Sequence, residues 1–182
     1  RTGRHRPRAP VITVGGPHGR GSCVALLDAV LRANGYRVAT FTSPHLLDYR
    51  ERIRIDGAMA SEASLIAAFE RAADALGPDS LTFFEFNALA ALLVFETACL
   101  DAIVLEVGLG GRLDAVNVVD ADVAADGQAV ALGPLRVVEA VRVSAQPVAR
   151  HVEEALHVLG SKRESLFEFV ARPDVLGVVL LG

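Results

Sequence analysis

The chain has 182 residues, of which 52 % are hydrophobic and 22 % charged, and its formal net charge is −4. This composition is typical of one globular domain with a substantial core, and it excludes a disordered chain. The acidic balance argues against broad nucleic-acid binding, and no apolar run is long enough to span a membrane. Two cysteines, Cys23 and Cys99, make no disulfide framework, and we expect both to be buried thiols in a reducing compartment.

The first ten residues form a basic, proline-containing segment. A transit peptide or a nucleic-acid-binding arm has a similar composition. The first predicted core strand begins directly after this segment, which favours a frayed end. We therefore expect residues 1–10 to lie outside the domain that follows.

A glycine-rich turn separates the first predicted strand from the first predicted helix. Apolar residues 11–14 predict a buried strand, glycine occupies four of the next seven positions, and an apolar-periodic helix is predicted over 22–34. Backbone N–H groups and the positive end of the helix dipole make such a turn suited to hold a phosphate group. A plain turn whose glycines serve only packing is the alternative.

Further along the chain, strands and helices alternate. Ser61 is expected to cap the second helix, and Thr82 with Glu85 matches the capping box that starts the third. The expected strands are 11–14, 36–41, a short edge strand at 53–55, 101–107 and one within 116–125; the expected helices are 22–34, 62–76 and 82 to about 99.

This alternation predicts an α/β fold: a parallel sheet of P-loop type with helices on both faces. The strands near 11–14, 36–41, 102–107 and 121–125 are expected to be neighbours in one sheet, which makes 11–125 a single domain. Residues 126–182 are expected to continue this domain with one helix and two strands, 167–172 and 175–181.

Side chains that carry oxygen follow three of the predicted strands. Ser22, Ser43 and Glu106 each lie just beyond a strand, and ligands of open α/β sheets bind beyond the carboxyl ends of the strands. Hydroxyl and carboxylate oxygens are ligands that Mg²⁺ takes beside a nucleotide phosphate. The sequence therefore predicts a magnesium site at this edge of the sheet.

Simpler roles are open for several of these residues. An ion pair with Arg112 is the alternative for Glu106, and a turn or capping role is the alternative for Ser43. His18 and His45 are expected to be histidines on surface loops rather than metal ligands, because no His/Cys cluster has the spacing of a zinc site.

Four motifs, in order along the chain, resemble those of one family. They are Gly16–Ser22 (GPHGRGS), Thr42–Leu46 (TSPHL) with Glu51–Ile55 (ERIRI), Thr82–Phe86 (TFFEF) and Leu105–Asn117 (LEVGLGGRLDAVN). Through these motifs, residues 11 to about 125 resemble the N-terminal ATPase domain of folylpolyglutamate synthase/dihydrofolate synthase, in the Mur ligase superfamily. The implied fold is that of the Mur ligase central domain. TSPHL and TFFEF argue against another Mur-type amide ligase.

The resemblance implies an ATP-dependent ligase that adds L-glutamate to dihydropteroate or to a folate through an acyl phosphate, with Mg²⁺ as the metal. Arg20 and Glu106 are the implied catalytic residues. The implied binding residues are Gly16, Pro17, His18, Gly19, Arg20, Gly21 and Ser22 for the ATP phosphates; Ser22, Ser43 and Glu106 for Mg²⁺; and Thr82, Phe83, Phe84, Glu85, Leu113, Asp114 and Ala115 for the pterin substrate. A cytoplasmic monomer that binds small molecules, and neither nucleic acid nor membrane, is implied.

Three features depart from the family pattern. Arg20 stands where the family has Lys, and a planar guanidinium is not equivalent to a compact ammonium in a tight phosphate loop. Pro17 removes one backbone N–H donor from that loop. The family's S-x-x-L-D-H and E-K-A-G segments, which carry a metal-binding His and a carbamylated Lys, do not follow Ala125. The resemblance therefore implies an internally deleted or truncated member, and a non-catalytic nucleotide- or pterin-binding remnant is the alternative.

Overall fold

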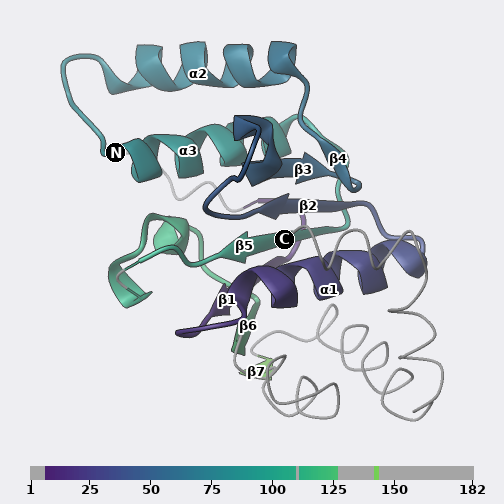
Figure 1. Ribbon diagram of the computed structural model, residues 1–182. Helices are drawn as coiled ribbons and strands as arrows, with labels where there is room; N and C mark the ends of the chain where they lie inside the picture. Colours follow the sequence, from purple (N-terminus) through teal and green to yellow (C-terminus); the bar gives the residue numbers. More distant parts are fainter. Residues whose placement is uncertain (1–6, 110, 127–141, 144–182) are drawn as a thin grey trace, which may run out of the picture.

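The computed structural model describes residues 7–109, 111–126 and 142–143, and a seven-stranded sheet of order β4-β3-β2-β5-β1-β6-β7 runs through them (Figure 1). The strands are β1 (Val11–Gly15), β2 (Val38–Phe41), β3 (Ile53–Ile55), β4 (Ala58–Met59), β5 (Ala102–Glu106), β6 (Val123–Asp126) and β7 (Arg142–Val143). The central strands β2, β5, β1 and β6 are parallel. The flanking strands β3, β4 and β7 pair antiparallel.

This arrangement confirms the predicted parallel α/β sheet and the predicted neighbours within it. The short strand at 53–55 is present, but β4 pairs along its outer side, so it is not the last strand of the sheet. β7 is a strand that the sequence did not predict.

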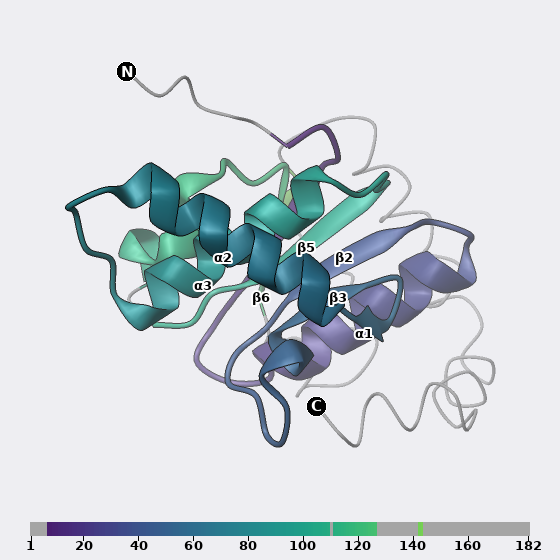
Figure 2. The ribbon, with the colours of Figure 1, turned by 90° about the horizontal axis from the view of Figure 1, so that it is seen from above.

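Helices cover both faces of the sheet, as predicted (Figures 1 and 2). They are α1 (Arg20–Ala33), α2 (Glu62–Leu76) and α3 (Phe83–Glu96). On one face, Val24, Leu27 and Leu31 of α1 share an apolar cluster with Ile12, Val14 and Val104 of the sheet. On the other face, Ala91, Val94 and Phe95 of α3 join Val11, Ile103 and Leu105. In Figure 1, α2 lies on the far side of α3 from the central strands.

Local signals set most of the helix ends. Gly35, with φ of 86°, follows α1 in the left-handed conformation that glycine adopts without strain. The Ser61 hydroxyl accepts a hydrogen bond from the Ser64 N–H at 3.2 Å and begins α2. Thr82 Oγ1 accepts from Glu85 N at 3.3 Å while Glu85 Oε2 accepts from Thr82 N at 2.7 Å. These contacts confirm the predicted cap and the predicted capping box.

The end of α3 was predicted wrongly. The helix ends at Glu96 rather than near residue 99, because Thr97 takes the C-cap position and its hydroxyl donates to the Val94 carbonyl at 2.8 Å. Cys99 consequently lies beyond the helix and is exposed, whereas Cys23 in α1 is buried as expected. Within the described ranges, no helix is both long and apolar enough to cross a membrane.

The remaining predicted elements lie outside the described residues. They are the helix expected after residue 129, the two strands expected at 167–172 and 175–181, and most of the basic segment at residues 1–10.

Replacing Thr82 with Ala removes the side-chain acceptor of the α3 capping box. We expect the free energy of unfolding to fall by about 1 kcal/mol, the typical contribution of a threonine or serine N-cap. Denaturant unfolding monitored by circular dichroism measures this loss. Ser80→Ala, in the exposed turn just before the helix, is the matched control and should stay within about 0.5 kcal/mol. Equal effects of the two substitutions would contradict the capping role.

Candidate functional site

The carboxyl ends of β1, β2 and β5 lie at one edge of the sheet. Val14 of β1 pairs with Glu106 of β5, and Phe41 of β2 pairs with Leu105 of β5. The three loops that follow these strands therefore start side by side. A cleft of about 560 Å³ opens there between the glycine loop, the loop after β5 and the end of β6; its lining includes Gly15, Gly16, Pro17, Arg20, Gly108, Arg112, Asn117 and Ala125.

Glu106 is the buried carboxylate at this edge, with only 4 % of its surface exposed. Its Oε2 accepts a hydrogen bond from the backbone N–H of Ser43 at 3.1 Å, and its Oε1 lies 3.8 Å from Arg20 Nε. Burial raises the pKa of the Glu106 carboxyl above its ordinary value, and the Ser43 N–H and the Arg20 guanidinium oppose that rise. The site thus contains a carboxylate whose negative charge is only partly compensated.

The structure brings two of the three predicted metal ligands together. Ser43 reaches Glu106 through its backbone N–H, so its hydroxyl is not used in that contact. Ser22 lies in the first turn of α1, half-buried, and its convergence with the other two stays a prediction. The described residues contain no group of three or more His, Cys, Asp and Glu side chains that could hold a metal ion.

The arginine beside Glu106 is not the one named in the alternative to metal binding. An ion pair with Arg112 was the alternative for this carboxylate, but the arginine beside it is Arg20. Arg20 Nη1 also donates to the carbonyls of Val107 and Gly108, directly after β5. The physical reason is the pairing of β1 with β5, which places the first residue of α1 over the end of β5, whereas Arg112 is exposed in the 3₁₀ turn η2 (Gly111–Leu113).

The glycine loop has the geometry of an anion cradle. Gly16 and Gly19 have φ of 110° and 74°, a region that favours glycine. No side chain caps α1 and its first turn holds no acidic residue, so its first N–H groups are left for a ligand or water. Pro17 and His18 are exposed at the tip of the loop, and His18 is on the surface as expected.

The residues expected to contact a substrate fall into two groups. Thr82 and Glu85 satisfy each other in the capping box. Asp114, 6 % exposed, accepts hydrogen bonds from Leu109 N at 2.8 Å and Val116 N at 3.0 Å. Its carboxylate therefore holds the loop after β5 and the 3₁₀ turn η3 (Ala115–Val118) in place.

The second group carries apolar surface. Phe83 and Leu113 are 65 % and 83 % exposed, and Ala115 is half-buried. Phe84 instead points inward: its ring centroid lies 5.8 Å from that of Phe41. A Cβ at Gly108 would lie 2.8 Å from Phe84 Cζ, so the loop passes the ring closely because residue 108 has no side chain.

Sequence reasoning missed a buried arginine next to this surface. Arg52, 7 % exposed, ends the 3₁₀ turn η1 (Tyr49–Arg52). Its Nε donates to His45 Nδ1 at 2.7 Å, and its guanidinium lies 5.6 Å from the centre of the Phe83 ring. His45 is therefore half-buried and paired rather than free on the surface. Arginine occupies every second position of residues 50–54, at Arg50, Arg52 and Arg54. No sequence signal distinguished the buried arginine from the other two.

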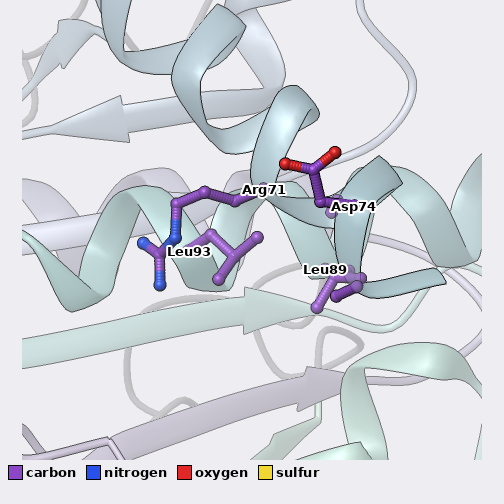
Figure 3. Close-up of a pocket in the computed structure, with 6 residues that line it drawn as sticks. Arg71, Asp74, Leu89 and Leu93 are labelled. Atoms are coloured by element: carbon purple, nitrogen blue, oxygen red, sulfur yellow. The ribbon is translucent and has the colours of Figure 1, made fainter. Parts of the chain in front are cut away.

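A second cleft, of about 470 Å³, is lined by residues of α2 and α3 (Figure 3). Arg71, Asp74, Leu89 and Leu93 line it, and the guanidinium of Arg71 pairs with Glu96 Oε2 at 2.8 Å. None of the predicted site residues borders this cleft, so we place the candidate site at the strand ends.

Comparison with known proteins gives consistent relatives, although no family model matches the chain. Dihydrofolate synthase/folylpolyglutamate synthase of Escherichia coli is 48 % identical over 124 residues, which are 68 % of this chain and 29 % of that protein. The corresponding protein of Haemophilus influenzae is 48 % identical over 114 residues, 63 % of this chain and 26 % of that protein. The chain thus spans less than a third of the length of these relatives.

Solved structures agree. E. coli FolC in complex with DHPP and ADP is 46 % identical, with a TM-score of 0.65 over 68 % of this chain and 30 % of that one. The Yersinia pestis enzyme complexed with AMPPNP and Mn ion is 49 % identical, with the same TM-score and coverage. Folylpolyglutamate synthase of Thermotoga maritima is 32 % identical, with a TM-score of 0.62 over 86 % of this chain and 41 % of that one.

The parallel sheet, the glycine loop between β1 and α1 and the carboxylate at the end of β5 define the class of P-loop-type α/β proteins with a Mur-ligase-like fold. Within that class, the chain matches the N-terminal part of folylpolyglutamate synthase/dihydrofolate synthase proteins over about two thirds of its own length.

Asp114→Ala tests whether this carboxylate holds the loop after β5. Two backbone N–H groups lose a charged acceptor, so we expect the free energy of unfolding to fall by about 2–4 kcal/mol. Hydrogen exchange of the Leu109 and Val116 amides should become faster as well. Asp79→Ala, at an exposed turn after α2, is the control and should change stability by less than about 0.5 kcal/mol. Unchanged amide exchange in Asp114→Ala would refute the role.

Proposed function

We propose that this chain is the ATP-binding part of an ATP-dependent amide ligase that joins L-glutamate to dihydropteroate or to a folate. One observation carries the proposal: an uncapped α1 begins beside Glu106, at the carboxyl ends of paired strands. Relatives of this sequence were solved with ADP, or with AMPPNP and Mn ion. Residues 11–125 would then be the ATPase domain, with 126–182 as its continuation.

The residues of the glycine loop receive the ATP phosphates in this proposal. The backbone N–H groups of residues 16 and 18–22 and the N-terminus of α1 supply donors and a favourable dipole. Pro17 has no N–H to give. Glu106, with the hydroxyls of Ser22 and Ser43, fits Mg²⁺, because these are hard oxygen ligands and the Glu106 charge is only partly compensated. A bound Mg²⁺ would neutralise charge that develops on the phosphates.

The reaction then has two steps. A carboxylate oxygen of the pterin substrate attacks the terminal phosphorus of ATP, which gives an acyl phosphate and releases ADP. The amine of L-glutamate attacks the acyl carbon, inorganic phosphate leaves with the former bond electrons, and the amine loses a proton as the amide forms. The role of Arg20 and Glu106 is to orient the phosphates and the metal, and exclusion of water protects the acyl phosphate.

Two exposed apolar side chains suit the pterin substrate. Phe83 and Leu113 present a ring and a branched chain to solvent, and the backbone around Asp114 is held rigid by two hydrogen bonds. A flat heterocycle gains from burial against such surfaces. Small-molecule substrates, rather than nucleic acid or a membrane, and a monomeric cytoplasmic chain are part of the same proposal.

A non-catalytic nucleotide- or pterin-binding remnant is the second candidate. Two observations favour it: the S-x-x-L-D-H segment does not follow Ala125, and Arg20 contacts strand-end oxygens rather than standing free over the glycine loop. Release of phosphate from ATP that depends on both dihydropteroate and L-glutamate separates the two. The ligase predicts this release, and the remnant predicts nucleotide binding without it.

Restoring the family residues in the loop tests the nucleotide site. The variant Pro17→Thr, His18→Asn, Arg20→Lys regains one N–H donor and a compact ammonium, and each charge-assisted contact contributes about 1.5–3 kcal/mol. We therefore expect it to bind Mg-ATP at least about tenfold more tightly than the parent chain, by isothermal titration calorimetry. Arg112→Lys, which changes the other cleft arginine outside the loop, is the control and should leave the affinity unchanged.

A folded triple variant with unaltered Mg-ATP affinity would contradict the assignment of residues 16–22 as the phosphate loop. Absence of any Mg-ATP binding in both proteins would contradict the proposed function itself.

A further inference from the structure

We propose that the guanidinium of Arg20 occupies the cation position at Glu106, so that a divalent cation binds this carboxylate only after Arg20 has moved away. Arg20 is then a group of the chain itself that competes with the metal for Glu106. Because Arg20 also belongs to the glycine loop, it links metal binding to that loop. The inference rests on the proposed function, which places a divalent cation at Glu106.

The contacts of Arg20 define the position. Its Nη1 donates to the carbonyls of Val107 and Gly108, and its Nε faces Glu106 Oε1 at 3.8 Å. Two carbonyl oxygens and a carboxylate oxygen therefore surround one positive group. Carbonyl and carboxylate oxygens are also the ligands of hard divalent cations, so the guanidinium and the metal compete for the same acceptors.

Burial makes this competition matter. Glu106 is almost completely enclosed, and a quarter of the Arg20 side chain is exposed, so the pair is screened less than a surface ion pair. A divalent cation that enters while Arg20 is present meets a positive charge a few ångströms away. Arg20 is the partially exposed member of the pair, and it begins α1 next to the open cleft, so it is the group that can leave.

Arginine, rather than lysine, suits this position. The planar guanidinium presents several N–H groups in a fixed fork. Here Nη1 donates to both carbonyls, and Nε faces the carboxylate. A lysine ammonium is a single point charge on a flexible stem and holds such a set less firmly. The presence of Arg20 where the family has Lys therefore makes residue 20 a stronger competitor for the metal.

The same side chain is the cation expected to meet the ATP phosphates, and it cannot serve both anions at once. A phosphate that draws Arg20 into the glycine loop leaves Glu106 without its cation and so favours the metal. Nucleotide and metal are then positively coupled, and the coupling is reciprocal.

Direct titration of the full chain with Mn²⁺ alone, followed by the loss of the free-ion electron paramagnetic resonance signal, tests the competition without nucleotide. We expect Arg20→Gln to bind Mn²⁺ at least about fivefold more tightly than the parent, because removal of a partly buried competing charge exceeds a surface effect. Arg20→Lys should lie between the two. Arg112→Gln, which removes another positive charge from the same cleft, controls for long-range electrostatics and should stay within about twofold. The gain must disappear in Arg20→Gln/Glu106→Gln.

The inference is overturned if Arg20→Gln binds Mn²⁺ no more tightly than the parent. It is also overturned if Arg112→Gln gains as much Mn²⁺ affinity, or if the gain survives in Arg20→Gln/Glu106→Gln. Thermal melts in EDTA show whether each variant is folded. If Arg20→Gln is not folded, Arg20→Lys decides: at least about twofold tighter binding supports the competition, and parent-like binding refutes it.

Titrations in the presence of ADP separate the two levels of proposal. If Glu106→Gln weakens Mn²⁺ binding with ADP but Arg20→Gln gives no gain without it, the proposed function stands and only the competition fails. If Glu106→Gln leaves Mn²⁺ binding unchanged under both conditions, the metal site in the proposed function fails as well.

Discussion

The parallel pairing of β1 with β5 is the constraint on which the rest of the site depends. Its register sets Val14 opposite Glu106, so the chain turns into the glycine loop directly beside the carboxylate. The right-handed crossover through α1 then places the first residues of that helix over the ends of both strands. Phosphate donors and a negative charge meet at one edge because two strands, far apart in the chain, share a ladder of hydrogen bonds.

The electrostatics of that edge are incomplete in the protein alone. A carboxylate removed from water is unfavourable unless charges or hydrogen bonds compensate for it. Glu106 receives one backbone N–H and one guanidinium, and burial still dominates its pKa. A group placed at a cost to stability is typical of a functional site. The cation that compensates the remaining charge of Glu106 can be Arg20 itself or an ion from solution. Movement of Arg20 decides which of the two is bound.

The surrounding loops are held by their own polar groups. Thr82 and Glu85 bond each other at the start of α3, and Asp114 bonds the backbone on both sides of η2. Of these polar side chains, only Asp114 is buried, and the apolar side chains of Phe83 and Leu113 are exposed. Loops held by hydrogen bonds, two exposed apolar side chains and a cleft that contains Arg20 and Arg112 together suit a ligand with a flat ring and a charged end.

The sequence by itself determined the features that depend on neighbouring residues: the alternation of strands and helices, the caps at Ser61 and Thr82, the stop at Gly35, and the four family motifs. Capping and turn formation act within a few residues, so their signals are local. Only the tertiary structure decided that Arg20, and not Arg112, pairs with Glu106, that Asp114 holds its own loop, and that Arg52 is the buried arginine of its stretch. These outcomes depend on which strand ends and loops meet in space. The charge of a side chain and its position in a motif do not specify a partner that lies far away along the chain.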